Sequence, residues 1–232
     1  MPDDPQNELL KQALQPLGDL LKRIAGPLAD EIGESLGVAA RHYRFRLALK
    51  MLQKTQRMLS EAGIAPQAVP PRLFLPIMEG ASIEDDEDLH SRWAALLANA
   101  ATSPTLVHPS YVEILKQLTP EDARLLDKLY DSCKAKRSRT VTPWVDLITY
   151  AERERRVAAG ENPEVPFQNL VGLGLVETVY TIDSSKIKVR FTQGRSAKFE
   201  GDLESHYELT ESAVAFVQAC RAPKTIDAQQ TA

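Results

Sequence analysis

Apolar residues recur at helical spacing through the first half of this 232-residue chain. Leucine, isoleucine and alanine fall three or four positions apart from residue 7 to residue 24, and apolar residues repeat in the same way from Leu28 to Leu59. This spacing puts one apolar stripe on each of two helices. Gly26-Pro27 separates the helices, and Gly63 occupies the position that glycine favours after a helix. We predict that an extended connector (65–71) and a short helix (72–81, with Pro76 as a candidate break point) complete this half.

Three more helices are predicted between Glu84 and Asp131, each with its own start signal. The acidic run Glu84–Asp88 precedes an apolar stripe from Leu89 to Ala100. Carboxylates at a helix N-terminus are attracted by the positive end of the helix dipole, and a divalent-metal site is the alternative interpretation of the same run. Pro109 fits the first position of the second helix, and Thr119 is a natural N-cap for the third.

After Ser132 the pattern changes to a mixture of helix and strand. The two longer predicted strands alternate apolar and polar residues, and Asp183-Ser184-Ser185 between them is a turn signal, so we expect a β-hairpin. The predicted elements are, in order, a basic loop with Lys134, Lys136, Arg137 and Arg139, a strand at Thr140–Thr142, a helix from Pro143, a loop from Val157 to Pro163, a helix from Phe167 to Leu173 closed by Gly174, strands at Leu175–Tyr180 and Lys186–Phe191, and a helix that Thr210 caps and that reaches Cys220.

This order of elements is similar to that of a winged helix-turn-helix domain. The predicted fold class is therefore mainly α, with an N-terminal multi-helix domain followed by a C-terminal winged helix-turn-helix-like domain with a β-hairpin. The predicted bounds are 7–118 for the helical domain and 119–222 for the winged-helix-like domain. Residues 1–6 and 223–232 are predicted to be disordered tails.

One part of the chain carries a family resemblance. An apolar helix with Trp93 leads into Leu96-Leu97-Ala98-Asn99-Ala100, and His108-Pro109-Ser110-Tyr111-Val112-Glu113-Ile114-Leu115-Lys116-Gln117-Leu118 follows. These residues resemble the core of the Abi-alpha (abortive infection alpha) family of prokaryotic proteins. Pro70-Pro71 and the helix through Gly80 also fit its layout, and Pro70–Tyr130 is the specific part of the resemblance. The resemblance implies a link to phage defence and supplies no catalytic residues.

The winged-helix prediction raises the question of DNA binding. A recognition helix needs side chains that reach base edges and phosphates, and the candidate helix Glu164–Gly172 offers only Gln168 and Asn169. The predicted hairpin is richer in cations, and its candidate phosphate contacts are Lys186, Lys188, Arg190, Arg195 and Lys198. The alternatives are a solvated hairpin edge, where lysines deter aggregation between strands, and a contact with another protein.

Cations also collect on the second N-terminal helix. A basic amphipathic helix binds anionic membrane surfaces, so Gly26–Arg57 is a candidate membrane-surface segment. The alternatives are a solvated face and a partner for an acidic helix, such as the one that starts at Glu84. Gly33 and Gly37 indicate close packing between helices or, in lipid, a helix contact. The basic group is Arg41, His42, Arg44, Arg46, Lys50, Lys54 and Arg57.

Charge and motif content exclude several classes of protein. The net charge of −4 is mild, and neither half has the strong positive field of a dedicated nucleic-acid binder. Cys133 and Cys220 form no CxxC pair, so we expect free thiols in a cytoplasmic protein. No signal peptide and no membrane-spanning run is expected. No catalytic or phosphate-loop motif is found, and no histidine (His42, His90, His108, His206) lies at metal-ligand spacing. We therefore expect no enzyme activity, no metal and no cofactor.

Three hypotheses about function follow. The first is a non-enzymatic, phage-defence associated protein that acts through contacts with a protein partner or with itself. The second is a DNA-binding transcriptional regulator that uses the winged helix. The third is a membrane-active effector that uses the N-terminal amphipathic helices.

Overall fold

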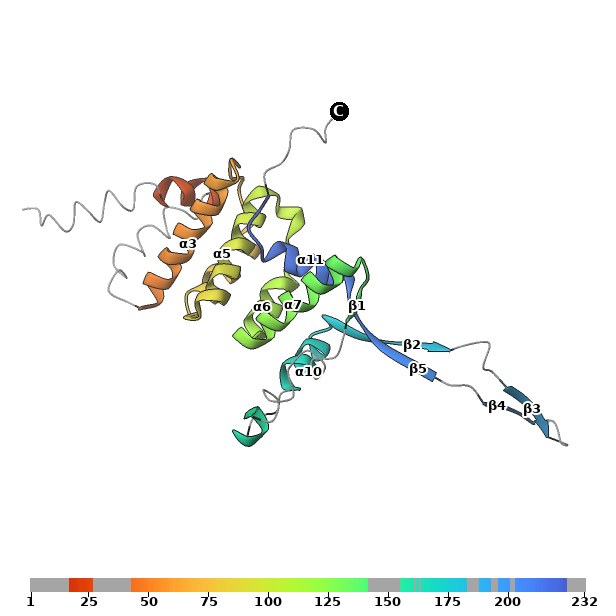
Figure 1. Cartoon of the computed structure of the whole chain (residues 1–232). Helices are drawn as coiled ribbons and strands as arrows, with labels where there is room; N and C mark the ends of the chain where they lie inside the picture. Colours follow the sequence, from red (N-terminus) through yellow and green to blue (C-terminus); the bar gives the residue numbers. More distant parts are fainter. Residues whose placement is uncertain are drawn as a thin grey trace, which may run out of the picture. The chain divides into compact units, whose positions relative to one another are not determined.

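The computed structural model describes residues 17–26, 43–141, 155–160, 162, 164–182, 188–192, 196–200 and 203–224. The fold is mainly helical, with a small three-stranded antiparallel sheet (Figure 1). The chain divides into two compact units: unit 1 comprises residues 1–120 and 216–232, and unit 2 comprises residues 121–215. Compactness does not establish that either unit folds alone, so the predicted domain bounds stay a prediction.

Several predictions lie outside the described residues, and they stay predictions. They are the helical residues 7–16 and 28–42, which include Gly33, Gly37, Arg41 and His42, the helix from Pro143, the turn Asp183–Ser185, the cations Lys186 and Arg195, and the disordered tails at 1–6 and 225–232.

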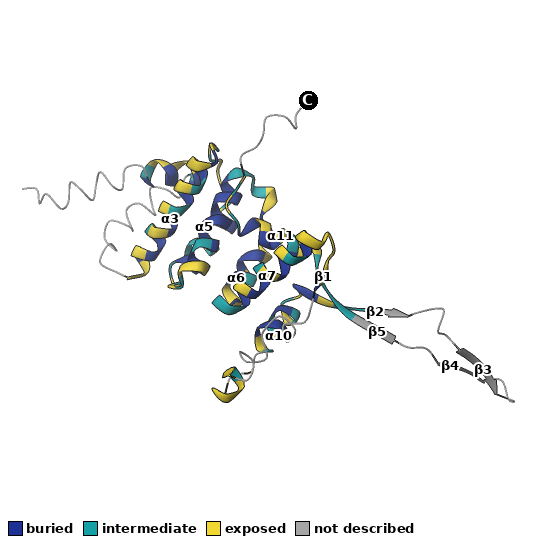
Figure 2. Cartoon of the chain, in the orientation of Figure 1, coloured by how far each residue is buried: buried dark blue, intermediate teal, exposed yellow. Residues whose placement is uncertain are grey.

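The helix α5 (Glu87–Thr102) is the central helix of unit 1. From Leu89 to Ala101 every residue except Ser91 is buried (Figure 2). It packs against α3 (Tyr43–Glu61) and α4 (Pro71–Ala81), and α6 (Ser110–Gln117) packs against α4. A helix that is buried on all sides needs apolar residues around its whole circumference. The remaining elements described in unit 1 are a helix at residues 17–25 and the 3-10 helix η1 (Pro104–Leu106).

The contact between α4 and α5 requires a glycine at position 80. Trp93 is 1% exposed, and a Cβ atom built on Gly80 would lie 2.4 Å from Cη2 of the Trp93 ring. Only glycine fits at this distance, which explains a residue of low helix propensity in the last turn of α4. Pro76 does not break α4, which continues to Ala81.

Helix ends follow the sequence signals with two corrections. Gly63 has the left-handed φ of +66°, and the N–H of Ile64 donates to the Leu59 carbonyl at 2.9 Å, so α3 ends as predicted. However, α6 begins at Ser110, which makes Pro109 its N-cap and not its first residue.

The second correction concerns the predicted basic loop. The helix α7 (Pro120–Lys136) includes Lys134 and Lys136. Lysine has a high helix propensity, and cations are favourable at the negative C-terminal end of a helix. The loop therefore begins only at Arg137. Residues 155–158 are also helical, so the predicted loop from Val157 begins two residues later.

Unit 2 contains the sheet, and one predicted strand pairing was wrong. The strands β1 (Thr140–Val141), β5 (Leu203–Leu209) and β2 (Val176–Ile182) lie in the order β1-β5-β2. We expected β2 to pair with the strand that follows residues 183–185, yet that strand, β3 (Lys188–Thr192), pairs with β4 (Ser196–Glu200). The strand β5 offers β2 seven consecutive pairs, from Val176↔Leu209 to Ile182↔Leu203, and Val176 and Leu209 are both buried.

The remaining elements of unit 2 are α10 (Val165–Gly172) and the start of α11 (Glu211–Ala219). Phe167 on α10 packs edge-on against the Tyr207 ring, with ring centroids 4.9 Å apart. Thr210 caps α11 as predicted, because its Oγ1 accepts from the N–H of Ala213 at 3.1 Å. The boundary between the two units falls inside α11, between Ala215 and Phe216.

Candidate functional site

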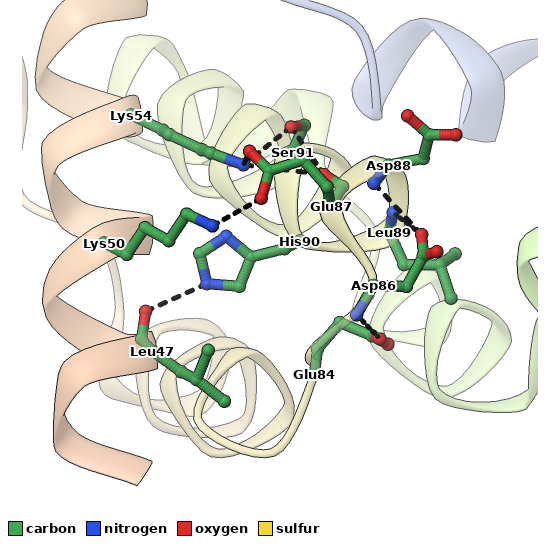
Figure 3. A network of polar contacts seen from close by, with 10 residues as sticks. All are labelled: Leu47, Lys50, Lys54, Glu84, Asp86, Glu87, Asp88, Leu89, His90 and Ser91. Carbon is green, nitrogen blue, oxygen red and sulfur yellow. Dashed lines mark hydrogen bonds and ion pairs between the residues drawn. The ribbon is translucent and has the colours of Figure 1, made fainter. Parts of the chain in front are cut away.

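A polar cluster in unit 1 joins α3 to the first turns of α5 (Figure 3). Nζ of Lys54 lies 2.6 Å from Oε1 of Glu87 and 2.9 Å from Oγ of Ser91, and Lys50 pairs with the other carboxylate oxygen of Glu87. Lys50 and Lys54 are one helical turn apart, as are Glu87 and Ser91, so each pair lies on one face of its helix. The interpretation that the basic helix is a partner of the acidic helix is confirmed for these two lysines.

The two lysines keep the Glu87 carboxylate ionised. Hydrogen bonds from Lys50 and then Lys54 lower the pKa of Glu87 to about 2. The Glu87 side chain is 62% exposed, so water and salt screen both ion pairs, and each contributes little to stability. The main effect of the cluster is to fix the position of α5 against α3.

The acidic run before α5 is a helix cap, as the sequence indicates. Oδ1 of Asp86 accepts from the N–H groups of Asp88 and Leu89 at 3.0 Å each, and Oε1 of Glu84 accepts from the N–H of Asp86 at 3.0 Å. Burial raises the pKa of Glu84. Across the described residues, no group of three or more His, Cys, Asp or Glu side chains could hold a metal ion.

His90 lies beside this cluster and is 1% exposed. Its Nε2 is 2.9 Å from the Leu47 carbonyl oxygen. A carbonyl oxygen only accepts, so Nε2 carries the proton and Nδ1, which has no hydrogen-bond partner among the described residues, is an acceptor. Burial is the main cause that lowers the pKa of His90, and the charges of Lys54 and Lys50 lower it further. His90 is therefore neutral at pH 7.

The sequence shows His90 at no metal-ligand spacing, and we predicted no contact for it. A signal for its burial was present, because His90 lies three positions before Trp93 and seven before Leu97, on the apolar stripe of the helix. The partner of His90 is a backbone carbonyl of another helix, and no pattern in the sequence predicts such a contact.

Asn99 connects α5 to the C-terminal end of α11. Its Nδ2 donates to the carbonyl oxygens of Ala219 at 2.9 Å and Arg221 at 2.8 Å. Carbonyl groups at a helix C-terminus have no partner within the helix. The asparagine of the Leu96–Ala100 stretch therefore has a structural role in unit 1.

The His108-Pro109-Ser110-Tyr111 stretch forms the start of α6. Nδ1 of His108 accepts from the N–H of Ser110 at 3.2 Å and lies 2.7 Å from its Oγ. The buried Tyr111 ring packs edge-on against Phe216, with centroids 5.6 Å apart. Burial raises the pKa of Tyr111. These residues anchor α6 and the end of α11 to the rest of unit 1.

The structure separates the predicted nucleic-acid contacts. Gln168 is exposed on α10, whereas Nδ2 of Asn169 donates to Oδ2 of Asp122 on α7 at 2.7 Å. The register of β3 and β4 places Arg190 opposite Lys198 and Lys188 opposite Glu200. The backbone register therefore pairs Arg190 with Lys198, while the Asn169 side chain is engaged within unit 2.

A hollow of about 260 Å³ in unit 2 includes Cys133 in its wall, with Tyr130, Arg137 and Val214 among its neighbours. Burial raises the pKa of the Cys133 thiol. The nucleophile in cysteine chemistry is the thiolate, so this thiol is mostly protonated and weakly nucleophilic at neutral pH.

The family model for abortive infection alpha matches residues 46–220. The chain belongs to the abortive infection alpha family. No curated protein and no solved structure matches the chain. The abortive infection alpha match includes the Lys50–Glu87 cluster, Asn99 and both sheets, and it leaves out the helix at residues 17–25. None of the helices in the described part of the chain is long and apolar enough to cross a membrane.

Proposed function

We propose that this abortive infection alpha protein acts in phage defence by binding another protein, and that it catalyses no reaction. The family match over residues 46–220 carries the proposal. The residues of the resemblance support a scaffold role, because Asn99 and Tyr111 hold helices together. The chemistry of two side chains supports the absence of catalysis. The Glu87 carboxylate is held in ion pairs, and the raised pKa of the Cys133 thiol makes it a weak nucleophile.

The outer side of α4 supports a protein contact. Leu75 is 49% exposed and Ile83, just after the helix, is 62% exposed. Leu75 lies on α4 and Ile83 lies two residues beyond its end, and the exposed Glu79 lies between them in the sequence. Exposed aliphatic side chains of this kind gain free energy when a partner covers them.

Phage plating tests the proposal. Expression of the full chain in a bacterial host should reduce the plating efficiency of at least one phage in a panel. The double variant Leu75→Ser with Ile83→Ser should lose this protection and the co-purification of the partner. Val157→Ser with Val165→Ser is the matched control, since both residues are similarly exposed in unit 2. No protection by the unmodified protein against any phage would contradict the defence role.

DNA binding by a winged helix is the second candidate, and the strand order of unit 2 favours it. In a winged helix a short first strand pairs with the returning strand of a hairpin, and β1-β5-β2 has this order. Arg190 and Lys198 are directly opposite each other. Cations at paired positions of one hairpin are candidate contacts for DNA phosphates.

Fluorescence anisotropy with a labelled DNA duplex at several salt concentrations tests this candidate. The variant Arg190→Gln with Lys198→Gln should lower the slope of log K against log salt by about 0.9 for each lost phosphate contact. The second candidate is wrong if the unmodified protein shows no salt-sensitive binding, or if the variant keeps the full slope.

A further inference from the structure

The exposed side of α3 carries a row of basic side chains. Arg46, Lys50, Gln53 and Arg57 are all exposed, and spacings of four, three and four positions put them on one stripe of the helix. The row extends about 16 Å along the helix, at about 1.5 Å per residue. No acidic residue occurs on α3 before Glu61, so the helix does not neutralise its own row.

An aromatic residue lies at the N-terminal end of the row. Tyr43 is 55% exposed, and the guanidinium carbon of Arg46 is 5.8 Å from its ring centroid. Arg44, by contrast, donates to Oγ of Ser82 at 3.1 Å. The row therefore consists of Arg46, Lys50 and Arg57, with a solvent-exposed phenol ring at one end.

We propose that this row binds the surface of a membrane that contains anionic lipids, with α3 lying in the plane of the headgroups. Lipid phosphates attract the cations, and a tyrosine ring is stable at the boundary between headgroups and hydrocarbon. Duplex DNA offers phosphates but no apolar layer for an exposed ring. This lipid contact is additional to the proposed protein contact and does not depend on it.

The Glu87 carboxylate opposes the proposed binding. Each cation near an anionic bilayer contributes about 1 kcal/mol, or about fivefold in the binding constant. Glu87 is paired with Lys50 and remains ionised at neutral pH, so it offsets about one of the three cations. Removal of this negative charge should therefore strengthen lipid binding, although the residue belongs to a different helix.

Vesicle sedimentation with the full chain tests the proposal. Vesicles of phosphatidylglycerol mixed with phosphatidylcholine should bind the protein in a salt-sensitive way, and vesicles of phosphatidylcholine alone should not. Arg46→Gln with Arg57→Gln should weaken binding about 25-fold, and Glu87→Gln should strengthen it about fivefold. Tyr43→Ser should weaken binding as well.

The matched control is Arg72→Gln with Arg124→Gln, which removes two exposed charges from α4 and α7 and changes the net charge equally. This control should bind like the unmodified protein. Equal loss in both double variants, or no binding to either kind of vesicle, would overturn the proposal. Binding of the row to duplex DNA but not to vesicles would also overturn it, in favour of nucleic acid. A gain from Glu87→Gln that appears with phosphatidylglycerol vesicles and not with phosphatidylcholine alone cannot result from apolar surface exposed by misfolding, so this variant keeps the test informative.

Discussion

Trp93 leaves Gly80 no room for a side chain, because a Cβ atom there would lie 2.4 Å from the ring. Gly80→Ala forces the ring or α4 to move, and overpacking of a core costs about 1–3 kcal/mol. Urea unfolding followed by tryptophan fluorescence measures this loss. Gly18→Ala is the matched control, since no heavy atom lies within 4 Å of a Cβ there and alanine stabilises a helix by about 0.5–1 kcal/mol. Equal effects of the two substitutions would contradict the packing account.

Acidification should destabilise the protein through His90. Burial lowers the pKa of His90 below its ordinary 6.5, so the unfolded chain binds this proton more readily than the folded chain. Stability rises with pH wherever the unfolded state binds more protons. The free energy of unfolding contributed by His90 is therefore present above pH 6.5 and is lost as the pH falls below that value.

Gln at position 90 tests this dependence, because it retains an N–H donor for the Leu47 carbonyl and does not titrate. Urea unfolding from about pH 7.5 to about pH 5.5 should show a smaller loss of stability for His90→Gln than for the unmodified protein. Parallel pH profiles for the two proteins would mean that other groups cause the loss.

At the scale of elements, Asn99 holds the end of α11. Asn99→Leu keeps the volume and removes the donor to Ala219 and Arg221. A buried polar group that loses its partner costs about 1–3 kcal/mol, so we expect a loss of this size in urea unfolding and faster amide hydrogen exchange at the end of α11. Gln117→Leu, which removes an exposed hydrogen bond to Glu113, should have a smaller effect. Similar losses for both variants would count against the buried contact.

Local signals in the sequence predicted the helices better than the strands. Asp86, Gly63 and Thr210 mark helix ends through contacts within a few residues, so a short window contains the information. The pairing of β2 with β5 joins residues that are 21 to 33 positions apart, and a turn signal at 183–185 predicted a closer partner. The alternation Leu203, Ser205, Tyr207, Leu209 was visible in the sequence and indicates a strand.

The candidate sites were predictable to a smaller extent. The opposite charges of the basic helix and the acidic helix start indicated a contact between them as one of three alternatives, because Coulomb attraction acts between any two opposite charges that lie close together. Asn169 was predicted as a base contact, yet it donates to Asp122. The hydrogen bond between Asn169 and Asp122 depends on how α7 and α10 pack, and no spacing in the sequence predicts that packing.

On the scale of the whole molecule, α11 belongs to both units. Ala213 is counted with unit 2, and Phe216 and Val217 with unit 1; all three are fully buried. A chain that ends after Thr210 loses the Phe216 ring beside Tyr111 and the acceptors of Asn99. Loss of a buried Phe costs about 3–5 kcal/mol, which approaches the whole stability of a typical domain.

We therefore expect the chain 1–210 to lose the cooperative thermal unfolding of unit 1, measured by circular dichroism. Phe216→Leu in the full chain is the control and should retain a cooperative transition at a lower temperature. A sharp thermal transition at an unchanged temperature in the chain 1–210 would show that unit 1 folds without α11.

The ribosome makes the last helix of unit 1 only after it has made unit 2. When residues 1–120 emerge, Tyr111 lacks the Phe216 ring and Asn99 lacks the carbonyl oxygens of Ala219 and Arg221, because these residues are not yet synthesised. Translation at about 5–20 residues per second puts on the order of 5–20 s between the two parts. During that interval the nascent chain exposes apolar surface of the kind that chaperones bind. Any activity that requires the complete fold of unit 1 begins only after α11 has left the ribosome.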